Sequence, residues 1–129
     1  MKQFLLLISL TLILSSFKTI PEKIFDSKAY KELGSPDTLV VPEGYTAIGD
    51  GAFYWCRSLT SISIPNSVTS IMRQAFANCS SLPSISIPNS VTFIGEYAFE
   101  GCYVLNQTDI PSRLYSFDQD LTDGDMDDY

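Results

Sequence analysis

The chain has 129 residues, 45% of them hydrophobic, which suffices for one folded domain with its own core and excludes disorder throughout. Its formal net charge is −7, and its eight Lys and Arg residues are spread out, so the clustered positive charge that nucleic acid binding needs is missing. The chain has no histidine, the usual general base and commonest metal ligand, so we expect no enzyme, no cofactor and no metal site.

The start of the chain predicts a secretory signal peptide over residues 1–20. Lys2 supplies a positive charge, residues 4–14 (FLLLISLTLIL) an apolar stretch, and Ser15 and Ser16 small residues where a peptidase could cut. The apolar run is shorter than the roughly 20 residues that span a bilayer, so no transmembrane span is expected. Because an A-x-A site is absent, an uncleaved anchor is the alternative. The predicted location is secreted or cell surface.

A 23-residue repeat organises the chain that follows. The phrase SISIPNSVT occurs at 61–69 and again at 84–92, and the repeats that contain it are identical at 15 of 23 positions. The register defines four units: 25–47, 48–70, 71–93 and 94–116. The predicted organisation is a signal peptide, a repeat domain over 21–117 and an acidic tail over 118–129.

Apolar residues recur at equivalent places in each unit, which predicts a shared core. Three of these columns are Phe25, Ile48, Ile71, Ile94 and Phe117; Tyr30, Phe53, Phe76 and Phe99; and Leu33, Cys56, Cys79 and Cys102. In SISIP the isoleucines alternate with serines, the pattern of a half-buried strand, and the proline ends that strand. Strands that repeat every 23 residues are too close for a crossover helix and pair in parallel by coiling into a solenoid.

The terminal units are expected to differ from the central ones, because an end unit must stop the stack. The first unit replaces the strand serines by Thr38 and Val40. The last brings Thr108 to an inward column and Arg113 to the turn.

The run L-x-x-I-x-I-P-N-S-V-T-x-I-G-x-x-A-F-x-x-C closely resembles the 23-residue leucine-rich repeat of the BspA-like (Treponema pallidum type) class, over about 25–117. The resemblance implies a curved leucine-rich-repeat solenoid, with strands 59–64 and 82–87 in a parallel concave sheet and short strands or turns on the convex side. It also implies a secreted or surface binding module for protein or glycan ligands, with an adhesion or surface-antigen role. The alternative is a structural or self-associating repeat fragment without a ligand of its own.

Candidate contact residues lie at outward positions. Small hydroxyls make a flat hydrogen-bonding face along the predicted strands, while Tyr54, Trp55 and Arg57 depart from their columns and are the residue types of binding hot spots. The candidates are Tyr54, Trp55, Arg57, Ser61, Ser63, Ser84, Ser86, Gln107 and Asp109. Trp55 covering the edge of the core is the alternative.

The three cysteines have the spacing of the repeat. We expect buried small residues, with one disulfide as the alternative, because stacked side chains point the same way. The acidic tail is expected to be solvated, with weak calcium binding as the alternative, since its aspartates depart from the spacing of a calcium loop. Asn78 and Asn106 lie in sequons that matter only in a host that glycosylates.

Overall fold

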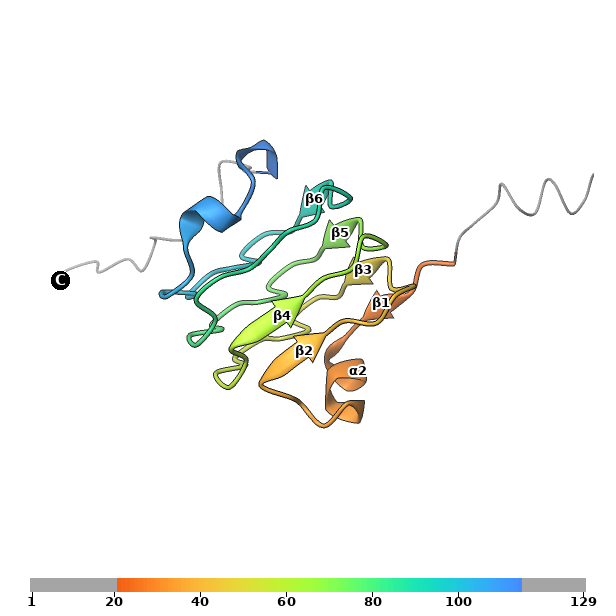
Figure 1. Cartoon of the computed structure of the whole chain (residues 1–129), viewed down its shortest axis with the longest axis horizontal. Helices are drawn as coiled ribbons and strands as arrows, with labels where there is room; N and C mark the ends of the chain where they lie inside the picture. Colours follow the sequence, from red (N-terminus) through yellow and green to blue (C-terminus); the bar gives the residue numbers. More distant parts are fainter. Residues whose placement is uncertain (1–20, 115–129) are drawn as a thin grey trace, which may run out of the picture.

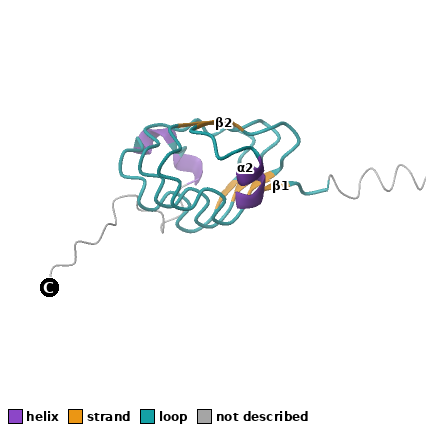
Figure 2. Cartoon of the chain, turned by 90° about the horizontal axis from the view of Figure 1, so that it is seen from below, coloured by secondary structure: helices purple, strands orange, loops and turns teal. Residues whose placement is uncertain are grey.

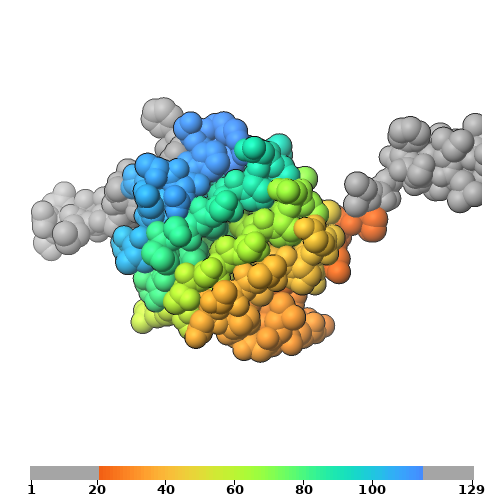
Figure 3. Space-filling view, viewed as in Figure 1, coloured from red at the N-terminus to blue at the C-terminus, as the bar shows by residue number. Residues whose placement is uncertain are grey.

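The computed structural model describes residues 21–114, in which successive repeats lie side by side (Figure 1). The predicted signal peptide, Phe117 and the acidic tail lie outside these residues. The elements are β1 (Ile24–Phe25), α2 (Ser27–Glu32), β2 (Thr38–Val40), β3 (Ala47–Ile48), β4 (Ser61–Ser63), β5 (Ser70–Ile71), β6 (Phe93–Ile94) and two 3-10 helices, η1 (Gln107–Asp109) and η2 (Ser112–Leu114). In the space-filling view the colours form bands that follow one another across the surface in chain order (Figure 3).

One layer of the molecule is a four-stranded parallel sheet in the order β1-β3-β5-β6. Ile48 pairs with Phe25 on one side and with Ile71 on the other, and Ile71 pairs with Ile94. Each step therefore equals the 23-residue repeat. Short strands or turns were predicted on the convex side, opposite the SISIP strands. These segments form the four-stranded sheet, which is the larger of the two.

A threonine ladder reinforces this sheet and explains why each central repeat carries SVT. The N–H of Thr69 donates to the Thr46 carbonyl at 2.8 Å, and the Thr69 hydroxyl donates to the same oxygen at 3.2 Å. Thr92 repeats both bonds to the Thr69 carbonyl, at 2.8 and 3.4 Å. One threonine per repeat thus ties its repeat to the one before through backbone and side chain together.

The second layer is the two-stranded parallel sheet of β2 and β4, seen almost edge-on opposite β1 in Figure 2. The strand predicted over 82–87 is reduced to a single parallel bridge between Ser63 and Ser86. The cause is Pro83, which stands where the preceding repeat has Thr60. Thr60 donates its N–H to the Asp37 carbonyl at 2.8 Å, whereas a proline has no N–H to give.

The core lies between the two layers and is built on a column of aromatic rings. Phe53 stacks on Phe76 with ring centroids 5.0 Å apart, and Phe76 stacks on Phe99 at 5.3 Å, with interplanar angles of 12° and 2°. Phe25 extends the stack on Phe53 at 5.7 Å. Tyr30, the expected first member of this column, instead meets Phe53 edge-on at 5.0 Å. The predicted common core of the repeats is confirmed by these contacts.

The helix α2 was not predicted, although its signals are in the sequence. Asp26 caps its N-terminus by accepting the Ala29 N–H at 2.8 Å. Gly34, with φ of +84°, ends it in a Schellman motif, in which the Gly34 N–H donates to Lys31. Because the helix replaces the turn of the other repeats, Leu33 is 49% exposed and does not share the buried environment of the cysteine column with which it was aligned.

The last repeat departs from the strand pattern, as expected of a terminal unit. Its strand position is taken by η1, so Thr108 is exposed rather than inward, and that prediction was wrong. Arg113, which was predicted to lie in a turn, lies in the 3-10 helix η2 and donates to the Val91 carbonyl at 2.6 Å. No helix among residues 21–114 is long and apolar enough to cross a membrane.

We predict that Phe76→Ala lowers the free energy of unfolding by about 3–5 kcal/mol, because the ring is fully buried between two others. The control is Tyr103→Ala, whose side chain is 72% exposed and should change stability by less than about 0.5 kcal/mol. Urea unfolding followed by circular dichroism measures both. Equal losses for the two variants would contradict the stacked core.

Candidate ligand-binding site

Tyr54, Trp55 and Arg57 form one exposed cluster on the turn that follows β3. The rings of Tyr54 and Trp55 stand at 87° to each other with centroids 6.2 Å apart, and both side chains are 49% exposed. The Arg57 guanidinium carbon lies 4.7 Å from the centroid of the Trp55 ring, a cation–π contact. The cluster thus combines an apolar corner with a positive charge held over one ring.

The backbone at Trp55 is in the left-handed region, with φ of +60°. The equivalent positions are Asn78 at +61° and Gly101 at +70°, the two residue types that tolerate this conformation best. The repeat imposes the conformation because the Trp55 N–H donates to the Ala77 carbonyl at 2.9 Å and the Asn78 N–H makes the same bond to Glu100. A half-exposed tryptophan therefore occupies a place where a side chain is strained.

Tyr97 is a candidate that the sequence argument missed. It lies at the other left-handed position of the turn, with φ of +56°, where earlier repeats have Gly51 and Gln74. Its side chain is 44% exposed. The sequence did contain a signal: the first central repeat has Gly51 at this position, whereas the third has an aromatic residue, Tyr97.

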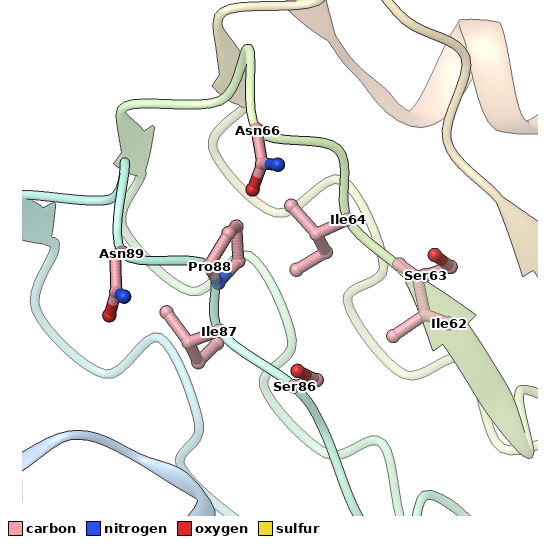
Figure 4. A pocket seen from close by; sticks show the side chains of 8 residues that line it. All are labelled: Ile62, Ser63, Ile64, Asn66, Ser86, Ile87, Pro88 and Asn89. Carbon is pink, nitrogen blue, oxygen red and sulfur yellow. The ribbon is translucent and has the colours of Figure 1, made fainter.

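The predicted serine face is exposed, and it is hollowed between two repeats. Ser61, Ser63, Ser84 and Ser86 all lie on the surface. A hollow of about 420 Å³ lies where the pairing between β4 and the next repeat narrows to one bridge, and it brings Ser63 and Ser86 together (Figure 4). Its lining residues are Ile62, Ser63, Ile64, Asn66, Ser86, Ile87, Pro88 and Asn89. The lining is neutral, with hydroxyl and amide groups above isoleucine side chains.

The two remaining candidates lie in η1 and differ in their contacts. Gln107 is exposed. The Asp109 carboxylate accepts the backbone N–H of Ile85 at 3.0 Å, so it stands in for the strand that the last repeat lacks. This bond gives Asp109 a structural role at the edge of the preceding repeat.

The cysteines are free thiols that stack along the repeats. Cys79 donates to the Phe53 carbonyl at 3.1 Å, and Cys102 donates to the Phe76 carbonyl at 2.9 Å. Cys79 and Cys102 are buried, and Cys56 is half-buried. The neighbouring Cys102 thiol and burial raise the pKa of the Cys79 thiol, and burial raises the pKa of Cys56. Of the predicted alternatives, the structure has free, buried thiols at Cys79 and Cys102, each bonded to a phenylalanine of the preceding repeat, while Cys56 is only half-buried.

The sequon asparagines both have local structural contacts. Asn78 is half-buried, and its side chain lies against Gly101, where a Cβ would overlap its amide. Asn106 caps η1, with its amide oxygen accepting from the Thr108 N–H at 3.2 Å and hydroxyl at 2.9 Å. Within residues 21–114, no three His, Cys, Asp or Glu side chains gather in an arrangement suited to a metal ion.

The family comparison agrees with this architecture. Residues 18–122 match the model of the BspA type leucine rich repeat region, which holds six copies of the repeat. The chain belongs to the BspA-type leucine-rich repeat family. No curated protein matches it.

Three solved structures of leucine-rich proteins resemble the chain. A leucine rich cell surface protein from Faecalibacterium prausnitzii A2-165 is 42% identical over 63% of the chain, with a TM-score of 0.55. The leucine rich repeat protein of T. pallidum is 32% identical over 66%, with a TM-score of 0.58, and a protein from Bacteroides ovatus ATCC 8483 is 40% identical over 53%, with a TM-score of 0.51. The chain covers 21%, 40% and 20% of the length of these proteins, respectively.

We predict that Trp55→Asn is more stable than Trp55→Ala by about 0.5–1 kcal/mol, because asparagine tolerates the left-handed backbone that alanine does not. Both variants lose the same ring contacts, so their difference isolates the backbone term. Urea unfolding measures it. An alanine variant that matches or exceeds the asparagine variant would show that residue 55 is not held in this conformation.

We also predict that iodoacetamide labels Cys56 first and reaches Cys79 and Cys102 only when the protein unfolds. Because burial raises the pKa of Cys56, its thiolate fraction at pH 8 is below that of an ordinary cysteine and its labelling keeps accelerating as the pH rises beyond about 8.5. Mass spectrometry after timed labelling identifies the modified residues. Labelling of all three at one rate in the native state would contradict the stacked, buried thiols.

Proposed function

We propose that this BspA-type repeat domain is a binding module that acts outside the cell, secreted or at the cell surface, with a protein or glycan as its ligand. Its repeats would form a leucine-rich-repeat solenoid of about four rungs over 21–117, behind a signal peptide at 1–20 and ahead of an acidic tail. A structurally similar protein of F. prausnitzii is a cell surface protein, which supports this location.

The observation that carries the proposal is Trp55. A half-exposed tryptophan at a left-handed position costs the fold about 0.5–1 kcal/mol relative to asparagine or glycine, which the same column holds in the next two repeats. Residues in such strained conformations cluster at ligand contacts. Tryptophan, tyrosine and arginine are also the side chains that dominate binding energy at interfaces.

The cluster suits a ligand with an apolar ring or aliphatic edge beside an acidic or hydrogen-bonding group. The perpendicular rings of Tyr54 and Trp55 supply the apolar corner, and Arg57 supplies donors to an oxygen. The serine face adds neutral hydrogen-bonding groups at Ser61, Ser63, Ser84 and Ser86, with Gln107 beyond them. Asp109 contributes less, since its carboxylate is already bonded to Ile85.

We predict that Trp55→Asn lowers affinity for a ligand found on an array of glycans or purified extracellular proteins by at least about tenfold, the loss typical of a hot-spot residue. The far-ultraviolet circular dichroism spectrum should be unchanged, because asparagine suits the backbone at this place. Arg57→Ala should show a smaller loss. Tyr103→Ala is the matched control, an exposed aromatic residue in another repeat.

Full binding by Trp55→Asn would remove the cluster from the site and leave the serine face as the candidate. An unmodified chain that binds nothing on either array would favour the structural alternative, a repeat fragment without a ligand of its own.

A further inference from the structure

The strand β2 has an unpaired edge among residues 21–114, as the outermost strand of its sheet (Figure 1). Val41 donates its N–H to the Ser63 carbonyl at 3.0 Å, and the Asp37 carbonyl also accepts bonds from the chain that leads into β4. Alternate residues of a strand face the same neighbour. The N–H and C=O groups of Thr38 and Val40 therefore point away from β4, toward the open edge.

The side chains along this edge favour strand pairing. Thr38 and Val40 are β-branched, and Val40 is 69% exposed, whereas the next repeat has Ser61 and Ser63 at these places. Open edges in stable monomers are commonly protected by a lysine or another charge on the strand, and β2 has none. Instead its length is limited to three residues, because Pro36 and Pro42 flank it.

The opposite side of the same layer is closed by side-chain and loop contacts. The Asp109 carboxylate takes the Ile85 N–H at 3.0 Å, and the Asn106 N–H donates to the Pro83 carbonyl at 3.2 Å. A second copy therefore finds no free strand there on which its β2 could add head to tail. Among residues 21–114, the self-pairing left to this layer joins one β2 edge to another.

We propose that two copies of the chain pair through β2, antiparallel, about a two-fold axis at Leu39. In this register Thr38 lies opposite the partner's Val40, and each such pair exchanges both of its N–H···O=C bonds. The two β-branched side chains also become cross-strand neighbours on the outer face. The contact is the same patch on both copies, so it closes at a dimer.

The dimension and charge of the edge favour a second β2 over a foreign strand. A longer strand would run past Pro36 and Pro42, which have no N–H to donate, whereas a second β2 has the same three-residue length and the same proline boundaries. Both strands are uncharged, and in this register the flanking Asp37 lies opposite Val41 of the other copy and not opposite another carboxylate. The inference is independent of the ligand proposed above, since it concerns a different strand and needs no ligand.

Amide hydrogen exchange measured by NMR on the full chain tests the pairing. In concentrated solution the amides of Thr38 and Val40 should exchange at least about tenfold more slowly than after roughly hundredfold dilution, because dilution frees the edge. Sedimentation velocity should show a dimer that dissociates over the same range. Equal exchange of both amides at the two concentrations would overturn the proposal.

Val40→Pro is the decisive variant, because it removes an N–H that points away from β4 and leaves the internal ladder intact. It should abolish the protection of Thr38 and shift sedimentation to the monomer. Val40→Lys should act in the same direction, and Ser63→Lys is its matched control, placing the same charge at the equivalent position of the paired strand β4. A dimer that survives Val40→Pro, or that Ser63→Lys disrupts as fully as Val40→Lys, would assign the association to another surface.

Discussion

The structure depends on the contact between equivalent side chains of successive repeats, above all the stacked rings of Phe53, Phe76 and Phe99. One repeat offers about eight inward side chains, worth about 10–20 kcal/mol if fully buried. Ordering its backbone costs roughly 1–2 kcal/mol per residue over 23 residues, so a lone repeat cannot fold. Phe76 is covered by the ring before it and the ring after it, so stability is shared between neighbours and belongs to no single repeat.

The same register decides where the chain is free to vary. The turns after β3, β5 and β6 each hold two left-handed residues, and the second of these places keeps that backbone whether the residue is Trp55, Asn78 or Gly101. Bonds between repeats, such as Trp55 N–H to the Ala77 carbonyl, hold the shape without involving the side chain. The scaffold can therefore hold an exposed aromatic residue in a strained conformation, because the contacts between adjacent repeats offset the loss of stability.

The repeated columns predicted the core because identical spacing puts identical side chains in contact, and Phe53, Phe76 and Phe99 are the clearest case. The structure departs from the repeat-based prediction where individual residues favour a different local backbone conformation. Asp26 and Gly34 start and end a helix that displaces Leu33, and Pro83 removes the N–H that a second SISIP strand needs. For the site, the sequence singled out the cluster around Trp55 because its residues depart from their columns. Tyr97 was missed because what marks it is its left-handed backbone, and a φ angle is known only once the fold is known.

The two edges of the layer that contains β2 and β4 differ in what satisfies their backbone hydrogen-bonding groups. At one end a carboxylate from η1 satisfies the Ile85 N–H, which a following strand would otherwise take. At the other end, the outward N–H and C=O groups of Thr38 and Val40 are free to pair as in a central strand, but no neighbouring strand lies beside them among the described residues. An unsatisfied edge is tolerated where water can solvate it, but it stays competent to pair. Because only one end of this layer is competent to pair among residues 21–114, the proposed association stops at two copies and does not extend into a fibre.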